Sequence, residues 1–130
     1  MQLTFPSKLC DAILQGETGG HPDPANAVGD GGRSIGPLQI SLGCWMDAVE
    51  HDASIGGVYA DCKDLDYAKK IFHSYLDRYA VFGDSLEVLA RIWNGGPNGY
   101  RKEATEPYWR AVKNLMDVAG NSRLDRESGG

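Results

Sequence analysis

The segment between residues 19 and 40 constrains the fold more than any other part of the chain. It holds six glycines and three prolines, whereas the sequence on either side repeats apolar residues at intervals of three and four. So dense a run of glycine and proline excludes a long helix. Its short apolar pieces at 27–28 and 38–40 predict a small β-hairpin or an irregular lobe. We therefore expect a helical domain with one non-helical insertion after its first helix.

Five segments carry the spacing of amphipathic helices. The first begins near Pro6 or Ser7, ends before Gly19, and places Glu17 four residues after Ile13 on its apolar stripe. The others are expected over residues 43–50, from 64 or 66 to 80, from 84 or 85 to 93, and from about 105 to 120. This pattern predicts the α+β class, mainly α, with about five helices around one core. We expect one domain over residues 1–120 and a mobile polar tail over residues 121–130.

The charge of the chain limits its partners. The formal net charge is −5; residues 1–66 contain ten acids and three bases, and residues 67–130 contain ten bases and eight acids. This balance argues against sequence-independent nucleic-acid binding, which depends on a basic surface. The bases between Arg91 and Lys113 are interspersed with acids, and we expect a solvated helical surface there in preference to a basic patch. No run of about 18 apolar residues is present, so we expect no membrane insertion. We also expect a monomer.

Three cysteines, Cys10, Cys44 and Cys62, limit the chain to at most one disulfide bond. The pairing is open, with Cys44 to Cys62 as one choice, and Cys10 falls within an apolar helical stripe, where we expect it in the core. Their spacing matches no zinc motif, so we expect no metal and no cofactor. Residues 1–6 lack the basic and apolar regions of a secretory signal. We therefore expect a chain made without a leader, or one whose leader has been removed.

Two carboxylates in contrasting surroundings indicate a chemistry. Glu17 continues the apolar stripe of the first helix, and partial burial there raises the pKa of a carboxyl and keeps it protonated. Asp30 lies among glycines in an open segment, where it is free to stay ionised. Hydrolysis of a glycosidic bond needs one carboxyl of each kind. Each residue alone has a simpler explanation, a solvated charge for Glu17 and ordinary turn chemistry for Asp30.

Three separated motifs resemble the invertebrate-type, or destabilase-like, lysozymes. They are ETGG at residues 17–20, GDGGRSIGPLQI at 29–40 and ARIWNGGPNGY at 90–100, followed by Tyr108 and Trp109. Together they span roughly residues 9–116 in the order and spacing of that family. A Glu-x-Gly-Gly motif by itself also resembles soluble lytic transglycosylases and goose-type lysozymes, so the specificity comes from the combination.

The resemblance implies a lysozyme-like fold and a muramidase, which cleaves the β-1,4 bond between N-acetylmuramic acid and N-acetylglucosamine in peptidoglycan. It implies Glu17 as general acid and Asp30 as nucleophile or electrostatic partner. Lysozymes are the type case of this division of labour, so the roles follow theirs. The residues expected to bind substrate along the sugar cleft are Ser34, Gln39, Ile40, Trp93 and Asn94. The implied partner is peptidoglycan or a chito-oligosaccharide, and the implied place of action is the cell wall.

The sequence departs from this family in three ways. Three cysteines cannot reproduce a dense disulfide framework, so we expect stability to come mainly from the helical core. Trp93 stands where the family usually has His, so the isopeptidase activity attributed to some members is not carried over. The Trp93 indole could instead pack against a sugar ring, or it could belong to the core. The lack of a visible signal favours a microbial or phage-borne relative, or a mature chain.

Two other functions stay open. A lytic transglycosylase would use Glu17 alone with the N-acetyl group of the sugar, and the presence of Asp30 favours hydrolysis over that reaction. A non-catalytic glycan-binding module would keep the fold without turnover. No histidine is placed by sequence near Ser34, so a Ser-His-Asp hydrolase has little support.

Overall fold

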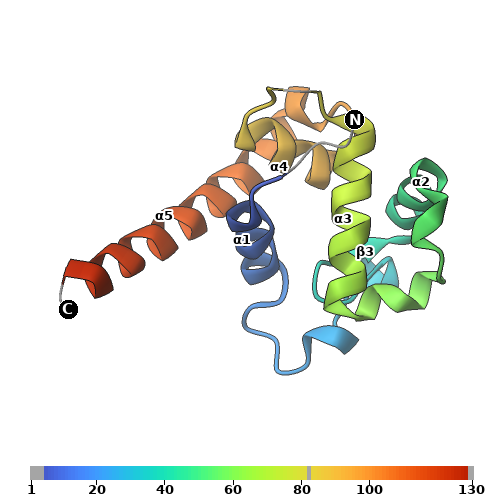
Figure 1. Ribbon diagram of the computed structural model, residues 1–130, viewed down its shortest axis with the longest axis horizontal. Helices are drawn as coiled ribbons and strands as arrows, with labels where there is room; N and C mark the ends of the chain where they lie inside the picture. The colour runs from blue at the N-terminus through green and yellow to red at the C-terminus, as the bar shows by residue number, and fades with distance from the viewer. Residues whose placement is uncertain (1–4, 82, 129–130) are drawn as a thin grey trace.

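The structure, a computed structural model, describes residues 5–81 and 83–128, with the backbone alone for residues 121–128. Over these residues the chain forms five α-helices and a three-stranded antiparallel sheet (Figure 1). The α-helices are α1 (Ser7–Thr18), α2 (Leu42–His51), α3 (Leu65–Tyr79), α4 (Leu86–Gly95) and α5 (Glu106–Ser128). The strands are β1 (Val28–Gly29), β2 (Ser34–Ile35) and β3 (Ile40–Ser41). The predicted mainly-α class is confirmed.

Side-chain caps fix the start of three helices. Ser41, Asp64 and Ser85 each accept a hydrogen bond from a backbone N–H in the first turn of α2, α3 and α4. Each bond satisfies a backbone donor that a helix start otherwise leaves unpaired. These caps explain why the predicted starts of α3 and α4 agree with the structure to within a residue or two.

The small sheet forms a lobe after α1, as the glycine-rich segment predicted. Strand β2 lies between β1 and β3, with Ser34 opposite both Gly29 and Ser41. The turn after β2 requires glycine, because Gly36 has φ of 80° and a Cβ there would overlap the carbonyl of Cys62. The lobe therefore packs tightly on the 3₁₀ helix η4 (Tyr59–Lys63), which precedes α3.

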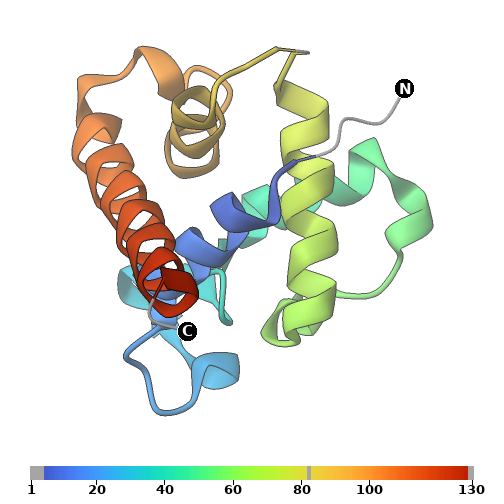
Figure 2. The same ribbon diagram turned by 60° about the vertical axis from the view of Figure 1, so that its left-hand side comes forward.

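Helix α3 lies between α2 and α4 (Figures 1 and 2), and its buried face is part of the hydrophobic core. Fully buried side chains come from α1, the lobe, α3 and α4; they include Leu9, Ile13, Leu38, Ile40, Phe72, Leu76 and Ile92. Cys10 is also in this core, as predicted, with 3% of its surface exposed. The lobe is thus fastened to the helices by Leu38 and Ile40, on either side of Gln39.

Helix α5 packs along α1 and then projects away from the body of the molecule (Figures 1 and 2). The sequence pattern placed its end at Gly120, but the helix continues to Ser128. That the tail after residue 120 is mobile stays a prediction. The two glycines that end the tail, and residues 1–4 at the start of the chain, lie outside the described residues.

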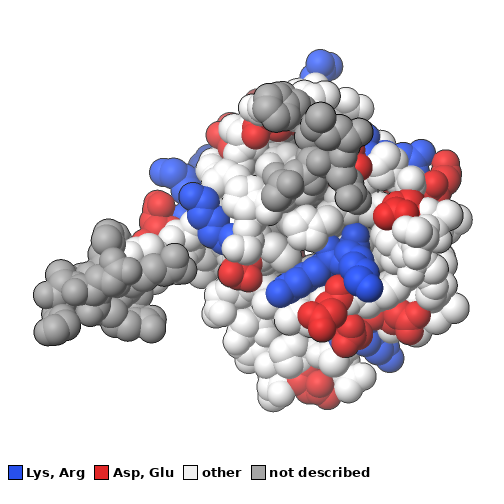
Figure 3. All heavy atoms as spheres, viewed as in Figure 1, with Lys and Arg blue, Asp and Glu red and all other residues white. Residues whose placement is uncertain are grey.

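Charged side chains of both signs share the surface. On the face seen in Figure 3, Lys and Arg side chains lie next to Asp and Glu side chains, and neither sign covers the face. Among the described residues, no helix combines the length and apolarity needed to cross a bilayer.

Candidate active site

Glu17 lies in the last turn of α1, where the helix meets the lobe. The stripe that ends at Ile13 is buried, and Glu17, four residues on, is half-buried. The next residue anchors this helix end, because the buried Thr18 hydroxyl donates to the Pro37 carbonyl at 2.8 Å. Burial raises the pKa of Glu17, and the charge of Asp30 raises it further. Such a carboxyl keeps its proton to higher pH and can act as a general acid.

Asp30 lies in the turn between β1 and β2 and is exposed. Its backbone has a φ of 51°, in the left-handed region that Asp tolerates better than most residues. The Ser34 hydroxyl donates to Asp30 Oδ2 at 3.1 Å. The hydrogen bond from Ser34 thus holds the Asp30 carboxylate in place across the turn. Strained backbone conformations such as that of Asp30 often occur at functional sites.

Gln39 fastens the lobe from within. Its side-chain amide donates to the Ala27 carbonyl at 3.1 Å and to the Gly36 carbonyl at 2.9 Å, and its φ is 52°. The amide oxygen lies directly against Gly29, where a Cβ would overlap it. Both amide hydrogens are therefore used inside the protein, and the side chain fixes the strand that leads into Asp30.

Trp93 and Asn94 come from the C-terminal turn of α4. The Trp93 indole packs edge-on against Phe72 and Tyr75, with ring centroids 4.9 and 5.7 Å apart. It is half-buried, so core packing and a place on the cavity wall are combined in one side chain. Asn94 is exposed beside it.

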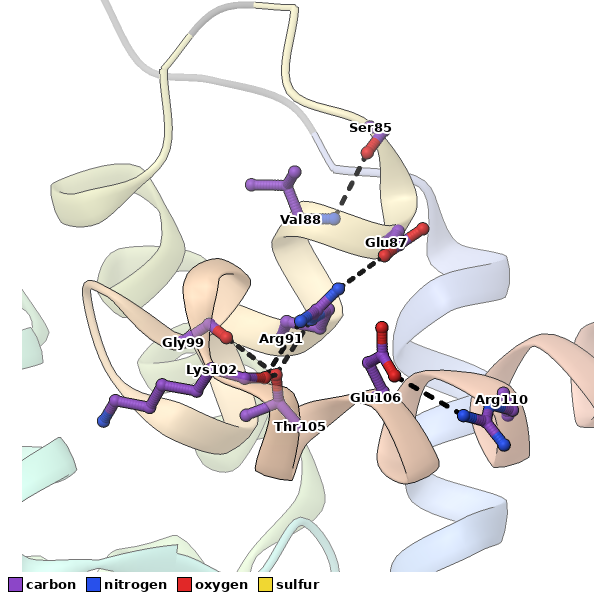
Figure 4. A network of polar contacts seen from close by, with 9 residues as sticks. All are labelled: Ser85, Glu87, Val88, Arg91, Gly99, Lys102, Thr105, Glu106 and Arg110. Carbon is purple, nitrogen blue, oxygen red and sulfur yellow. Dashed lines mark hydrogen bonds and ion pairs between the residues drawn. The ribbon is translucent and has the colours of Figure 1, made fainter.

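A buried arginine holds this end of α4 (Figure 4). Arg91 is 8% exposed and donates to Glu87 at 2.7 Å, to the Thr105 hydroxyl at 2.8 Å and to the Lys102 carbonyl at 2.9 Å. The expectation of a solvated surface was therefore wrong for Arg91. Two of its partners, Lys102 and Thr105, lie 11 and 14 residues along the chain, so no local pattern marks Arg91 as buried. The network fastens the loop after Asn94 to the helix that presents Asn94.

The side chains of Glu17, Asp30, Gln39, Trp93 and Asn94 meet at one cavity of about 240 Å³. Its lining residues are Glu17, Gly29, Asp30, Ser34, Gln39, Ser41, Cys44, Trp93 and Asn94. The structure thus brings together both predicted catalytic residues and four of the five predicted substrate-binding residues. Ile40 lies elsewhere: its side chain is 1% exposed, within the core.

Sequence reasoning missed Ser41 and Cys44 as cavity residues. Ser41 had a detectable signal, since a serine before an apolar helical pattern is a typical cap. Cys44 had none, because the face of a short helix that meets the lobe depends on tertiary packing. All three cysteines are free thiols. Burial raises the pKa of Cys44, so its thiol stays protonated.

A more open hollow of about 440 Å³ lies beside Thr18, lined mainly by apolar residues such as Leu14 and Pro24, and contains neither Glu17 nor Asp30. Within the described part of the chain, no three His, Cys, Asp or Glu side chains gather as metal ligands would.

Comparison with known proteins gives a consistent set of relatives. No protein-family model matches the chain. It is 37% identical over 84 residues to lysozyme 1 of Crassostrea virginica, covering 62% of this chain but 44% of that relative. It is 36% identical over 95 residues to invertebrate-type lysozyme 6 of Caenorhabditis elegans, covering 65% of this chain and 69% of that relative.

A solved structure shares the architecture as well. The crystal structure of Tapes japonica lysozyme matches with a TM-score of 0.68 at 30% identity, over 82% of this chain and 87% of that chain. Sequence and structure comparisons therefore point to one family.

Proposed function

The chain belongs to the invertebrate-type lysozyme family, and from that membership we propose that it hydrolyses peptidoglycan as a muramidase. The bond cleaved is the β-1,4 bond between N-acetylmuramic acid and N-acetylglucosamine. Glu17 gives its proton to the leaving glycosidic oxygen. Asp30 faces the positive charge that develops on the sugar, as nucleophile or as electrostatic partner. The enzyme then acts at the cell wall.

One observation carries the proposal: a single cavity holds two carboxyls whose surroundings differ. Glu17 is half-buried and its pKa is raised, whereas Asp30 is exposed and accepts a hydrogen bond from Ser34. One group is suited to holding a proton and the other to facing a cation. This pairing favours hydrolysis over a transglycosylase reaction, which needs Glu17 alone.

The other cavity residues divide into two roles under this proposal. Asn94 and Trp93 contact the sugar, an assignment that their position on the cavity wall supports. Gln39 acts by holding the lobe, because its amide is bound to two backbone carbonyls. Ile40 supports Gln39 from the core and does not touch the sugar.

The test compares wild type, Glu17→Gln and the exposed control Glu103→Gln on purified peptidoglycan. We expect Glu17→Gln to abolish release of soluble fragments and Glu103→Gln to release them at the wild-type rate. Mass spectrometry of the products should show reducing ends. A 1,6-anhydro end would instead identify a lytic transglycosylase. Tight binding of chito-oligosaccharides by wild type without turnover would identify a binding module.

A further inference from the structure

The Tyr108 hydroxyl is buried, and among the described residues it makes no hydrogen bond of good geometry. A buried hydroxyl of this kind costs folding free energy, and native proteins retain few of them. A phenylalanine at position 108 would keep the same ring and avoid that cost in folding free energy. The hydroxyl therefore calls for an explanation beyond packing.

Tyr108 lies in the first turn of α5, and the contact of α5 with α1 brings it to Glu17. The two helices pack side by side (Figures 1 and 2). They approach so closely that a Cβ on Gly16 would lie 3.3 Å from Leu115 Cδ1. The Tyr108 side chain comes close enough to Glu17 for its hydroxyl and the carboxyl to interact.

The hydroxyl and the Glu17 carboxyl influence each other. Burial, and then the Glu17 charge, raise the pKa of Tyr108, so the phenol keeps its proton. Burial and then the charge of Asp30 raise the pKa of Glu17, and a weaker side-chain hydrogen bond from Tyr108 acts in the opposite direction. Cys10 on α1 also faces Tyr108, and Cys44 is the other titratable group on the cavity wall. The hydroxyl has not closed a bond of good geometry, as is common at catalytic groups before substrate binds.

We propose that Tyr108 is a positioning residue for Glu17, and that its hydroxyl donates a hydrogen bond to the carboxylate left when Glu17 protonates the glycosidic oxygen. This inference rests on the proposed acid role of Glu17. The proton that leaves Glu17 goes to the sugar oxygen, and Tyr108 keeps its own. The protonated carboxyl needs no donor, whereas the new carboxylate in its half-buried place does. Tyr108 thus supplies a donor at the moment charge appears.

The test compares Tyr108→Phe with the control Tyr67→Phe, which removes a tyrosine hydroxyl that binds elsewhere in the protein. In the wild type, the Tyr67 hydroxyl donates to the Gly56 carbonyl and accepts from Trp45. The ionisation of Glu17 is followed by carboxyl-carbon NMR of protein labelled in glutamate, with the signal identified by its absence in Glu17→Gln. Cleavage of a chito-oligosaccharide is measured across the same pH range.

In Tyr108→Phe we expect the pKa of Glu17 to rise, and the alkaline limb of kcat/KM to move to higher pH with it. We expect kcat to fall severalfold with KM unchanged, and Tyr67→Phe to match wild type in both readouts. A Glu17 titration identical in Tyr108→Phe and wild type would overturn the inference. If wild type cleaves no glycan, the proposed function fails, and the NMR titration still decides whether Tyr108 acts on Glu17.

Discussion

Glu17 is an ionisable side chain in a half-buried place on the wall of the cavity. Because burial raises its pKa, the folded state holds the Glu17 proton more tightly than the unfolded state, whose pKa is near the ordinary 4.5. Glu17 therefore contributes stability at pH below 4.5, and that contribution is lost as pH rises through the pKa of the folded state. At neutral pH the protein keeps an ionisable acid at a cost in stability.

Replacing that acid with its neutral isostere should reverse the cost. We expect Glu17→Gln to melt at a higher temperature than wild type at about pH 8, and the difference to shrink at about pH 4, where Glu17 is protonated. Thermal unfolding followed by circular dichroism at both pH values measures the difference. Glu103→Gln, at an exposed position, serves as the control. A Glu17→Gln difference that is the same at both pH values would show that burial does not bear on the Glu17 proton.

At the scale of elements, Arg91 and Arg110 offer a comparison of two ion pairs with the same spacing. Each arginine pairs with a glutamate four residues earlier in its helix, and both pairs are visible in Figure 4. The Arg91 side chain is 10% exposed and that of Arg110 is 74% exposed. Arg91 also holds Thr105, which in turn donates to the Gly99 carbonyl at 2.7 Å. The two ion pairs thus differ in the burial of the arginine, and among the described residues only the Arg91 pair is linked to a loop.

We expect Arg91→Ala to lower the free energy of unfolding by about 3 kcal/mol or more, because it leaves buried polar groups unpaired. Arg110→Ala should lower it by about 0.5 kcal/mol or less, since an exposed pair contributes little. Urea denaturation of both variants measures the two values. Equal losses of unfolding free energy in the two variants would mean that the network around Arg91 does not hold the loop. In that case the cleavage activity of Arg91→Ala would match that of wild type.

The elements also show how far sequence reasoning reaches. Helix α3 was predictable because its apolar spacing and the Asp64 cap are both local. Strand β2 was not, because two residues in a glycine-rich run become a strand only when Ser34 pairs with Gly29 and Ser41. The grouping of Glu17 with Asp30 followed from motifs. The approach of Tyr108 depends on the crossing of α1 and α5, which no local pattern encodes.

The whole molecule is held together by its helical core, since all three cysteines are free thiols. We therefore expect the melting temperature to be the same, within about 1 °C, with and without a thiol reductant. A disulfide of ordinary strength would give a fall of about 5 °C or more on reduction. Calorimetry in both conditions decides the matter. A fall of that size would show that two of these cysteines pair in solution and would overturn the expectation.

The position of Glu17 on α1 has one more consequence for its chemistry. The peptide dipoles of a helix add up to partial negative charge at its C-terminal end, where the last carbonyls lack partners within the helix. Glu17 is the second-to-last residue of α1, so the backbone itself opposes a second negative charge there. The same side chain in the first turn would meet the opposite field and release its proton more readily. The direction in which α1 runs into the lobe thus helps the Glu17 carboxyl to keep its proton.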